Sequence, residues 1–455
     1  MSQQAAGLSV HKWARRAFYL FLIARLGLVG LTLRDPTGGV LVDSEDYIFL
    51  ANQLSQGSYQ DPSGGNRDLT RPPGYPLFLA TTFVPTGATW VPVLLQLAAT
   101  SLLAFLVFRA CAAQFSPSAG LVAGWLIALS PNLMLWSATI MTEALFALLI
   151  ASAALLLWAP ASARPGGGKV MGAAILLAGA IYLRPVGIVL APTWLVLMIA
   201  LKPSSAANNG GKRAVVGFAA IVALLVIPWY LRNLATHGQF SFSNVGYKTM
   251  TGFNLAEAIA DAEGLSRNDA VQLLPAAEGL VPLTLEVASR YPVSFAKVQI
   301  LGVLRTLAGT DIGTWGIIMG WDSWKGLGLL SGLFGRGDIF GDSPLAGNRG
   351  ALETTLHRAI LGLSLAYSLV LLVAAGAASL LALRSRVAQP FFWFVLVTAA
   401  LLIVGPGAAG QARFRVPAEP FLALAAALAL WPRKSAGLGA KNGVDAPGTN
   451  KAGMD

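Results

Sequence analysis

Long apolar segments recur along most of the chain, and they limit its possible folds more than any other feature. About ten of them approach or exceed the roughly 20 residues that a helix needs to cross the hydrocarbon core of a bilayer. Only 12% of the 455 residues are charged, about half the share of a soluble domain. Backbone groups inside a bilayer must bond to one another, which favours helices. The sequence therefore predicts an all-α polytopic membrane protein.

The predicted spans form an N-terminal group and a C-terminal group. The first, 16–33, is not expected to be a cleaved signal peptide, because Arg25 interrupts it and no small-residue cleavage site follows. The others cover 89–110, 117–136, 141–158, 169–183, 186–201, 213–230, 358–383, 390–404 and 416–431. Two further segments, 291–307 and 326–334, are candidates for dipping into or crossing the bilayer.

Basic residues predict the orientation of these spans. With the N-terminus inside, every inner loop carries lysine or arginine, as the positive-inside rule requires. Both termini are then cytoplasmic, and the site described below lies on the periplasmic or extracellular side of an inner (plasma) membrane. The net charge of +11 follows from this topology, so we expect no nucleic-acid partner.

This topology divides the chain into five parts. A cytoplasmic tail, 1–15, precedes a transmembrane module, 16–231, that contains a first outer loop at 34–88. An extracytoplasmic subdomain, 232–357, is expected to lie on the membrane before the last helices, 358–432, and a disordered cytoplasmic tail, 433–455. Cys111 is the one cysteine and the three histidines are scattered, so neither a disulfide within the chain nor a zinc motif is predicted.

The polar stretch 42–79 has the layout of a site, with acids at one end and an arginine at the other. Helical spacing places Asp43, Asp46 and Tyr47 on one side of a short helix. One interpretation is structural: Asp43 or Ser44 caps the helix, and the acids complement its dipole. The functional interpretation makes Asp43 a general base that takes a proton from an acceptor hydroxyl.

Five arginines lie on the predicted outer side, against the basic-inside bias. Any one of them alone could be a loop arginine, or one whose side chain snorkels to the membrane–water interface. Several converging from separate helices indicate a phosphate site, because the guanidinium group binds phosphate through a fork of donors. The predicted phosphate ligands are Arg71, Arg184, Arg232, Arg413 and Arg415.

Glu143 begins the span 141–158 at its outer end, level with Asp43. It could serve only to complement the helix dipole, but acids at membrane depth usually face a cavity. We predict that Glu143, together with Asp46, supplies further carboxylates for substrate. Arg25, in the middle of the first span, is expected to face the bundle interior as a structural residue.

Taken in order, these pieces resemble the GT-C glycosyltransferases, and among them the protein O-mannosyltransferase and lipid A aminoarabinose transferase-like branch. The first outer loop carries the resemblance in Asp43-Ser44-Glu45-Asp46-Tyr47 and Arg71-Pro72-Pro73-Gly74-Tyr75-Pro76. The later matching pieces are Thr142-Glu143, Leu183-Arg184-Pro185, Pro228-Trp229-Tyr230-Leu231-Arg232-Asn233 and Arg413-Phe414-Arg415-Val416-Pro417.

The resemblance implies a GT-C-like bundle of about 10–13 transmembrane helices. It implies transfer of a sugar from a polyprenyl-phosphate donor to a lipid, glycan or protein acceptor of the cell envelope, with inversion. Asp43 would be the base, Glu143 the second acid, and Tyr47 and Tyr75 would line the substrate. Metal dependence varies in this family. No Asp-x-Asp occurs in the first loop, so we predict no obligatory metal or other cofactor, although a divalent metal is possible.

Three alternatives use the same residues differently. A lipid or solute transporter would bind with these acids and arginines without chemistry, but many transporters have internal repeats, and none is visible here. A ligase or polymerase that moves a whole lipid-linked glycan needs the same phosphate-binding residues and a wider cleft. A scaffold with a vestigial site would not need to keep acids and arginines together.

Overall fold

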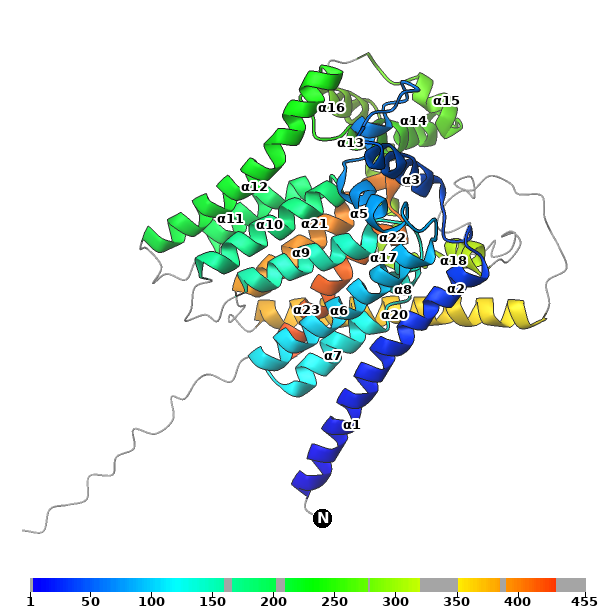
Figure 1. The fold of residues 1–455 in the computed structure, drawn as a ribbon. Helices are drawn as coiled ribbons and strands as arrows, with labels where there is room; N and C mark the ends of the chain where they lie inside the picture. Colours follow the sequence, from blue (N-terminus) through cyan, green and yellow to red (C-terminus); the bar gives the residue numbers. More distant parts are fainter. Residues whose placement is uncertain are drawn as a thin grey trace, which may run out of the picture.

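The computed structural model describes residues 3–158, 166–201, 209–276, 279–319, 351–384 and 390–430. All regular structure in these residues is helical, and the chain is an all-α polytopic membrane protein, as predicted. Figure 1 shows an inclined bundle of helices with a group of shorter helices across one end. The predicted segment 326–334 and the tail 433–455 lie outside the described residues.

Among these helices, four stretches are long and apolar enough to cross a membrane: Ala14–Arg34, Trp90–Gln114, Gly211–His237 and Arg358–Leu380. Two shorter helices, α7 (Pro117–Ala128) and α8 (Pro131–Ser137), make a fifth if the bent pair counts as one span. Four further apolar helices are shorter: α9 (Glu143–Leu157), α10 (Gly167–Leu183), α11 (Gly187–Ala200) and α21 (Pro390–Val404). The total of 10–13 spans stays a prediction.

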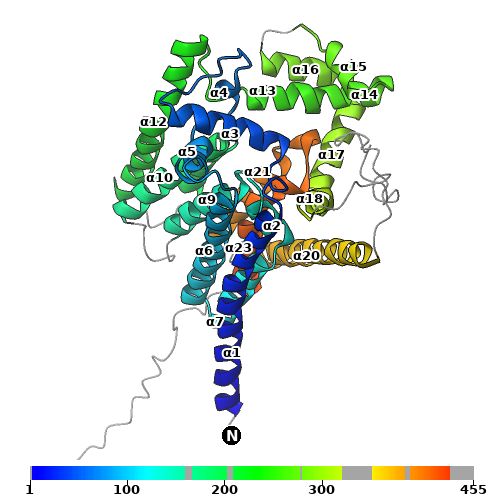
Figure 2. The same ribbon diagram turned by 45° about the vertical axis from the view of Figure 1, so that its right-hand side comes forward.

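The first and last helices complete the bundle. The chain begins with α1 (Gln3–Ala24), η1 (Arg25–Leu28) and α2 (Val29–Arg34), which follow one another along one line in both views (Figures 1 and 2). The long helices are α6 (Trp90–Gln114), α12 (Asn209–His237) and α20 (Ala351–Arg384). The chain closes with η4 (Gly407–Ala409), α22 (Ala412–Arg415), η5 (Val416–Ala418) and α23 (Glu419–Leu430).

Small residues allow the bundle helices to approach closely. A Cβ on Gly120 of α7 would lie 2.6 Å from the carbonyl oxygen of Phe108 on α6, and one on Gly124 would lie 2.9 Å from the Phe18 ring on α1. Lipid tails are as apolar as leucine, so membrane helices associate through such close packing rather than through the hydrophobic effect. Arg25 is 3% exposed and donates to Thr100 Oγ1 at 3.1 Å, which confirms that it faces the bundle interior.

The predicted single span 117–136 is instead bent by 52°. The bend lies at Ser130-Pro131, where Pro131 begins α8 and Ser130 Oγ accepts a hydrogen bond from the backbone N–H of Leu133 at 2.9 Å. Proline suits the first turn of a helix and interrupts one that would continue through it. The break ends α7 there and turns α8 towards the polar end of the bundle, where Trp136 lies.

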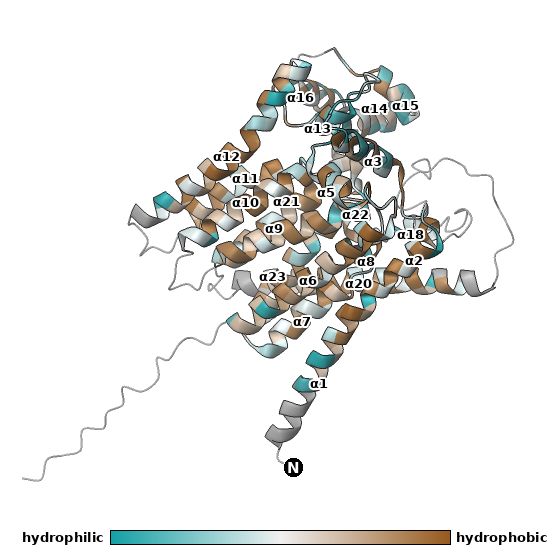
Figure 3. Ribbon diagram, viewed as in Figure 1, coloured by the Kyte–Doolittle hydropathy of each residue, from teal (hydrophilic) through white to brown (hydrophobic). Residues whose placement is uncertain are grey.

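Hydrophilic residues gather at one end of the bundle, as Figure 3 shows around α3 and α13–α16. The segment after α2 forms α3 (Val42–Ser55), α4 (Arg67–Thr70) and α5 (Gly74–Thr82), and α3 lies across the bundle end (Figure 2). The segment after α12 forms α13 (Val245–Thr249), η3 (Met250–Leu255), α14 (Ala256–Glu263), α15 (Arg267–Gln272), α16 (Leu280–Arg290), α17 (Pro292–Ala308) and α18 (Ile312–Ile318).

This second group has a small core of its own and is anchored to the end of α21. The core is built around Leu255, Ile259, Val287 and Val298, and it includes Ala408 of η4. At the anchor, the backbone of α17 touches the η4 loop, and the Gln299 side chain of α17 accepts a hydrogen bond from the backbone N–H of Ala408 at 3.1 Å. A Cβ on Gly302 would lie 1.8 Å from the carbonyl oxygen of Gly407.

We expect Gly302→Ala to lower the free energy of unfolding by about 1–3 kcal/mol or more, because the added methyl group overpacks a backbone contact. The measurement is the melting temperature of the purified protein in detergent. Gly217→Ala in α12 is the control, since no atom lies within 4 Å of its added Cβ and alanine favours a helix over glycine. Equal melting of wild type and Gly302→Ala would contradict the close contact.

Candidate active site

Hydrogen bonds to the loop before α9 fix the start of α3. The Ser44 hydroxyl donates to the carbonyl oxygen of Ile140 at 2.9 Å and accepts from the backbone N–H of Leu41 at 2.9 Å. The N-cap residue is Leu41, so the prediction that Asp43 or Ser44 caps the helix is wrong. Ser44 instead ties α3 to the bundle, and Asp43 lies in the first turn with its carboxylate directed at side chains far away in sequence.

Asp43 lies between two arginines. Its Oδ1 accepts a hydrogen bond from Arg71 at 2.7 Å, and its Oδ2 accepts one from Arg413 at 2.9 Å. Arg71 also pairs with Asp46 at 3.3 Å. Burial raises the pKa of the Asp43 carboxyl, but the charges and hydrogen bonds of Arg413 and Arg71 outweigh that effect and lower the pKa to about 2. Asp43 is therefore ionised throughout the physiological range.

A second ion pair stands at the start of α9. Glu143 is fully buried and pairs with Arg184, which also donates to the Thr142 hydroxyl at 3.2 Å. Arg184 contacts Oε1 of the Glu143 carboxylate, and Oε2 has no hydrogen-bond partner among the described residues. Arg184 and Arg413 both lie over the ring of Phe414, at 5.7 and 5.0 Å from its centre. The two ion pairs, Asp43–Arg413 and Glu143–Arg184, therefore both border the ring of Phe414.

Tyr47 and Tyr75 form the support behind Arg71. The two rings meet edge to face at 4.9 Å, and the Arg71 guanidinium lies 5.0 Å from the centre of the Tyr47 ring. Tyr75 is fully buried and donates to Gln96 at 2.7 Å. Both tyrosines are buried: Tyr47 supports Arg71, and Tyr75 supports Tyr47.

Two of the five predicted phosphate ligands are engaged elsewhere. Arg232, at the end of α12, donates to Asp68 at 2.7 Å and to the carbonyl oxygen of Tyr59. Arg415 is 1% exposed and pairs with Glu419 at 3.2 Å. The structure therefore brings Arg71, Arg184 and Arg413 to the cluster and gives the other two structural partners.

Asp311 was not among the residues singled out from the sequence. It lies between α17 and α18, and its Oδ2 accepts a hydrogen bond from the indole N–H of Trp136 at 2.7 Å. Burial raises the pKa of the Asp311 carboxyl to about 6, although the hydrogen bond from Trp136 and the charges of Arg413 and Arg415 act to lower it. The sequence signal was a lone acid directly after an amphipathic helix, which on its own suggests only a loop residue.

These residues form what we call the carboxylate–arginine cluster: Asp43, Asp46, Arg71, Glu143, Arg184, Asp311 and Arg413. Within the described ranges, no group of three or more His, Cys, Asp or Glu side chains is arranged to hold a metal ion. In the cluster, arginines take both oxygens of Asp43. The arrangement suits an anionic ligand that can share the arginines with the carboxylates.

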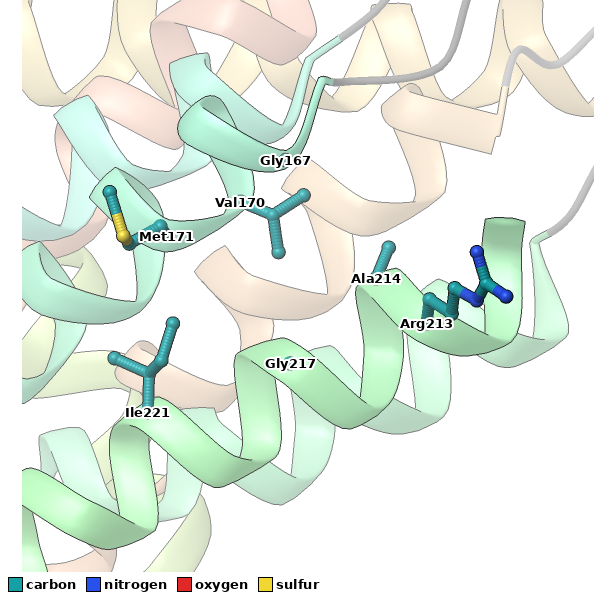
Figure 4. A pocket seen from close by; sticks show the side chains of 7 residues that line it. All are labelled: Gly167, Val170, Met171, Arg213, Ala214, Gly217 and Ile221. Atoms are coloured by element: carbon teal, nitrogen blue, oxygen red, sulfur yellow. The ribbon is translucent and has the colours of Figure 1, made fainter. Parts of the chain in front are cut away.

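Cavities elsewhere in the bundle do not border this cluster. One of about 270 Å³ lies between α10 and α12, with Val170, Met171 and Ile221 along it and Arg213 at one end (Figure 4). Another of about 500 Å³ lies between α1, α6 and α7, and Lys12, Arg15 and Arg109 line it.

Comparison with known proteins gives distant likenesses in structure. No protein-family model matches the chain, and no curated protein matches it. The archaeal oligosaccharyltransferase AglB from Archaeoglobus fulgidus, in complex with an inhibitory peptide and a dolichol-phosphate, has 16% identity and a TM-score of 0.46 over 91% of this chain. This chain spans 50% of that protein's length.

Two crystal structures of ArnT from Cupriavidus metallidurans are also similar. The one bound to undecaprenyl phosphate has 13% identity and a TM-score of 0.40 over 90% of this chain and 77% of that one. The apo structure has 12% identity and a TM-score of 0.37, over 94% of this chain and 78% of that one. Likenesses of this strength do not assign the chain to a family.

The Asp68–Arg232 pair gives a prediction about stability. Burial raises the pKa of Asp68, but hydrogen bonds from Arg232 and His237 lower it overall. The folded pKa lies below the unfolded value of about 3.9, so Asp68 stabilises the fold above that pH and ceases to do so as the pH falls. Asp68→Asn should cost about 1–3 kcal/mol at pH 7.

The measurement is the melting temperature in detergent from pH 7 to about pH 2. The gap between wild type and Asp68→Asn should stay near its full size down to about pH 4 and narrow as the pH falls further, through the lowered folded pKa of Asp68. Glu286→Gln, at an exposed position, is the control and should melt with the wild type throughout. A gap that does not change with pH would contradict the role given to the ionised Asp68.

Proposed function

We propose that this chain is a membrane transferase that moves a sugar from a polyprenyl-phosphate donor to a hydroxyl group of a lipid, glycan or protein acceptor. The observation that supports it best is the carboxylate–arginine cluster at the polar end of an apolar bundle. An isoprenoid tail would lie among the helices, and its phosphate would lie at the level of the arginines. In this proposal that end faces the outside of an inner membrane, as the basic loops indicate.

Three arginines of the cluster are the proposed phosphate ligands. Arg413 Nε is buried and has no hydrogen-bond partner among the described residues, so one donor of its fork is free for a ligand. Arg71 and Arg184 lie on its two sides through their shared contacts with Asp43 and Phe414. Guanidinium groups held by carboxylates and aromatic rings lose little freedom when they bind phosphate.

In the proposed transfer these arginines stabilise the leaving group. The bond between the sugar and the phosphate oxygen breaks, and negative charge builds on the phosphate as it does so. Donors already directed at that charge lower the barrier, because they need little reorganisation during the reaction. The sugar passes through an oxocarbenium-like state, as in glycosyl transfer generally.

The role of Asp43 as general base stays a prediction. A carboxylate with a pKa of about 2 is a weak base, since the best catalytic pKa lies near the operating pH. The contacts of Asp43 favour a different task, which is to hold Arg71 and Arg413 in place. Glu143 would do the same for Arg184 through Oε1, and its Oε2, which has no hydrogen-bond partner among the described residues, would be offered to a hydroxyl group of a sugar.

A ligase that moves a whole glycan from the same kind of carrier is the nearest alternative. It would use the same arginines and differ in the size of the transferred group. A transporter would bind the lipid phosphate without forming a product, so detection of a new glycosidic bond decides between transport and transfer.

Arg413→Gln should weaken binding of undecaprenyl phosphate, used as the probe, by about 10- to 100-fold. A hydrogen bond to a charged group contributes about 1.5–3 kcal/mol, and its loss weakens binding by this factor. Binding is measured on the purified protein in detergent. Arg290→Gln, at an exposed position, should bind as the wild type does. Equal binding by both variants would remove Arg413 from the phosphate site.

The reaction itself is tested by mass spectrometry of envelope glycolipids and glycoproteins, in cells with and without the chain. We expect one class of glycan to disappear without the chain and to return with the wild type or Arg290→Gln, but not with Arg413→Gln. No change in any glycan would count against a transferase.

A further inference from the structure

Asp311 is built into the cluster by backbone contacts on two sides. A Cβ on Gly309, two residues earlier, would lie 3.1 Å from the backbone nitrogen of Ala412, the residue before Arg413. At the far end of α18, a Cβ on Gly38 would lie 3.5 Å from the carbonyl oxygen of Ile318. The segment that carries Asp311 is therefore held between the loop before α3 and the start of α22.

The conformation of Asp311 is unusual for a residue at the start of a helix. Its φ of 46° and ψ of 32° lie in the left-handed region, which costs a residue with a side chain about 1–2 kcal/mol. It is the N-cap residue of α18, but its side chain does not cap the helix. The carboxylate turns instead to the indole of Trp136. Aspartate enters this region more readily than most residues, and residues held there cluster at functional sites.

Arg413 lies near both Asp311 and Asp43. The guanidinium carbon of Arg413 lies 6.0 Å from the centre of the Trp136 ring, whose N–H binds Asp311, and Arg413 also binds Asp43 at 2.9 Å. The proposed phosphate ligand thus contacts Asp43 directly and borders the residue that binds Asp311. Asp311 is half-buried, so a substrate can reach it.

The charged groups that act on Asp311 come from two helices. Arg413 and Arg415 of α22 favour its ionised form, and Glu143 of α9 opposes it. The basic residue nearest to Asp311 in sequence is Arg305, in the last turn of α17, the helix before it. Unlike Asp43, Asp311 forms no ion pair within 4.0 Å to a described residue. Where the surroundings of two carboxyl groups set their pKa values apart, the two groups usually have different catalytic roles.

We propose that Asp311 is the residue that accepts the proton of the acceptor hydroxyl in the transfer described above. This inference rests on the proposed function. Trp136 positions the carboxylate, and Asp43 binds Arg71 and Arg413. The acceptor is therefore expected to approach from the α17–α18 side of the cluster, where its hydroxyl group meets the carboxylate of Asp311.

The step balances as follows. The oxygen of the acceptor hydroxyl forms a bond to the anomeric carbon, and the bond from that carbon to the phosphate oxygen breaks with its electron pair on the phosphate. The hydroxyl proton passes to the Asp311 carboxylate and later to water. The products are the glycosylated acceptor and the polyprenyl phosphate, whose added negative charge lies against Arg71, Arg184 and Arg413.

The first test uses Asp311→Asn, in the cells and with the undecaprenyl phosphate probe described above. We expect transfer to fall by about 10²- to 10⁴-fold, the usual contribution of a general base, with binding of the probe within about threefold of wild type. Asp311→Glu should restore part of the activity. Full transfer by Asp311→Asn would overturn the inference and leave the proposed function standing. Absence of any wild-type product would overturn both.

The second test is the pH profile of glycan formation in membrane vesicles. A base with a pKa of about 6 is protonated below that pH, so wild-type activity should rise between pH 5 and 7. If Asp43 were the base, activity would be level over this range, because its pKa is about 2. A level profile would therefore overturn the inference.

Trp136→Phe tests the positioning of Asp311 through the same profile. It removes a hydrogen bond that lowers the pKa of Asp311, so the rise should move to higher pH by up to about one unit. Trp194→Phe is the matched control, because Trp194 is also buried and donates one hydrogen bond, to Thr398 at 3.1 Å. Its midpoint should equal that of the wild type. A common midpoint for all three proteins would contradict the contact between Trp136 and the base.

Discussion

The pairing of Asp43 with two arginines is the interaction on which the polar end of this protein depends. Arg71 comes from the same segment between α2 and α6, and Arg413 from the short helix α22 before the final helix. Two guanidinium groups this close would repel each other in a site that excludes much of the water. A carboxylate between them offsets that repulsion. It also joins the N-terminal part of the chain, which carries Asp43 and Arg71, to the C-terminal part, which carries Arg413.

Hydropathy was sufficient to predict most of the bundle. The span predicted at 390–404 is α21 (Pro390–Val404), and the spans predicted at 169–183 and 186–201 end within two residues of α10 and α11. The bend at Ser130-Pro131 was not predicted, although both residues were visible. An average over some 20 residues is insensitive to one proline, and only packing decides whether such a proline ends a helix or kinks it.

The site was predictable in part, and the two groups of arginines show why. Arg184 and Arg232 look alike in sequence, since each comes just after a predicted apolar span (169–183 and 213–230) that has a tyrosine near its end. Their partners differ: Glu143 for Arg184, and Asp68 for Arg232. Nothing in a single sequence indicates which acid a given arginine will meet. Asp311 escaped notice for the same reason, because its character comes from Trp136 and Arg413, more than 100 residues away on either side.

The contact between Asp43 and Arg413 also has a consequence for biosynthesis. The two residues are 370 positions apart, so a ribosome makes nearly the whole chain before the second partner exists. Until then Asp43, in the segment between α2 and α6, has Arg71 as its one described ion-pair partner. A chain that stops before α22 would therefore insert most of its helices and still leave Asp43 half-neutralised. Completion of the last helices is what brings Arg413 to Asp43 and closes the site.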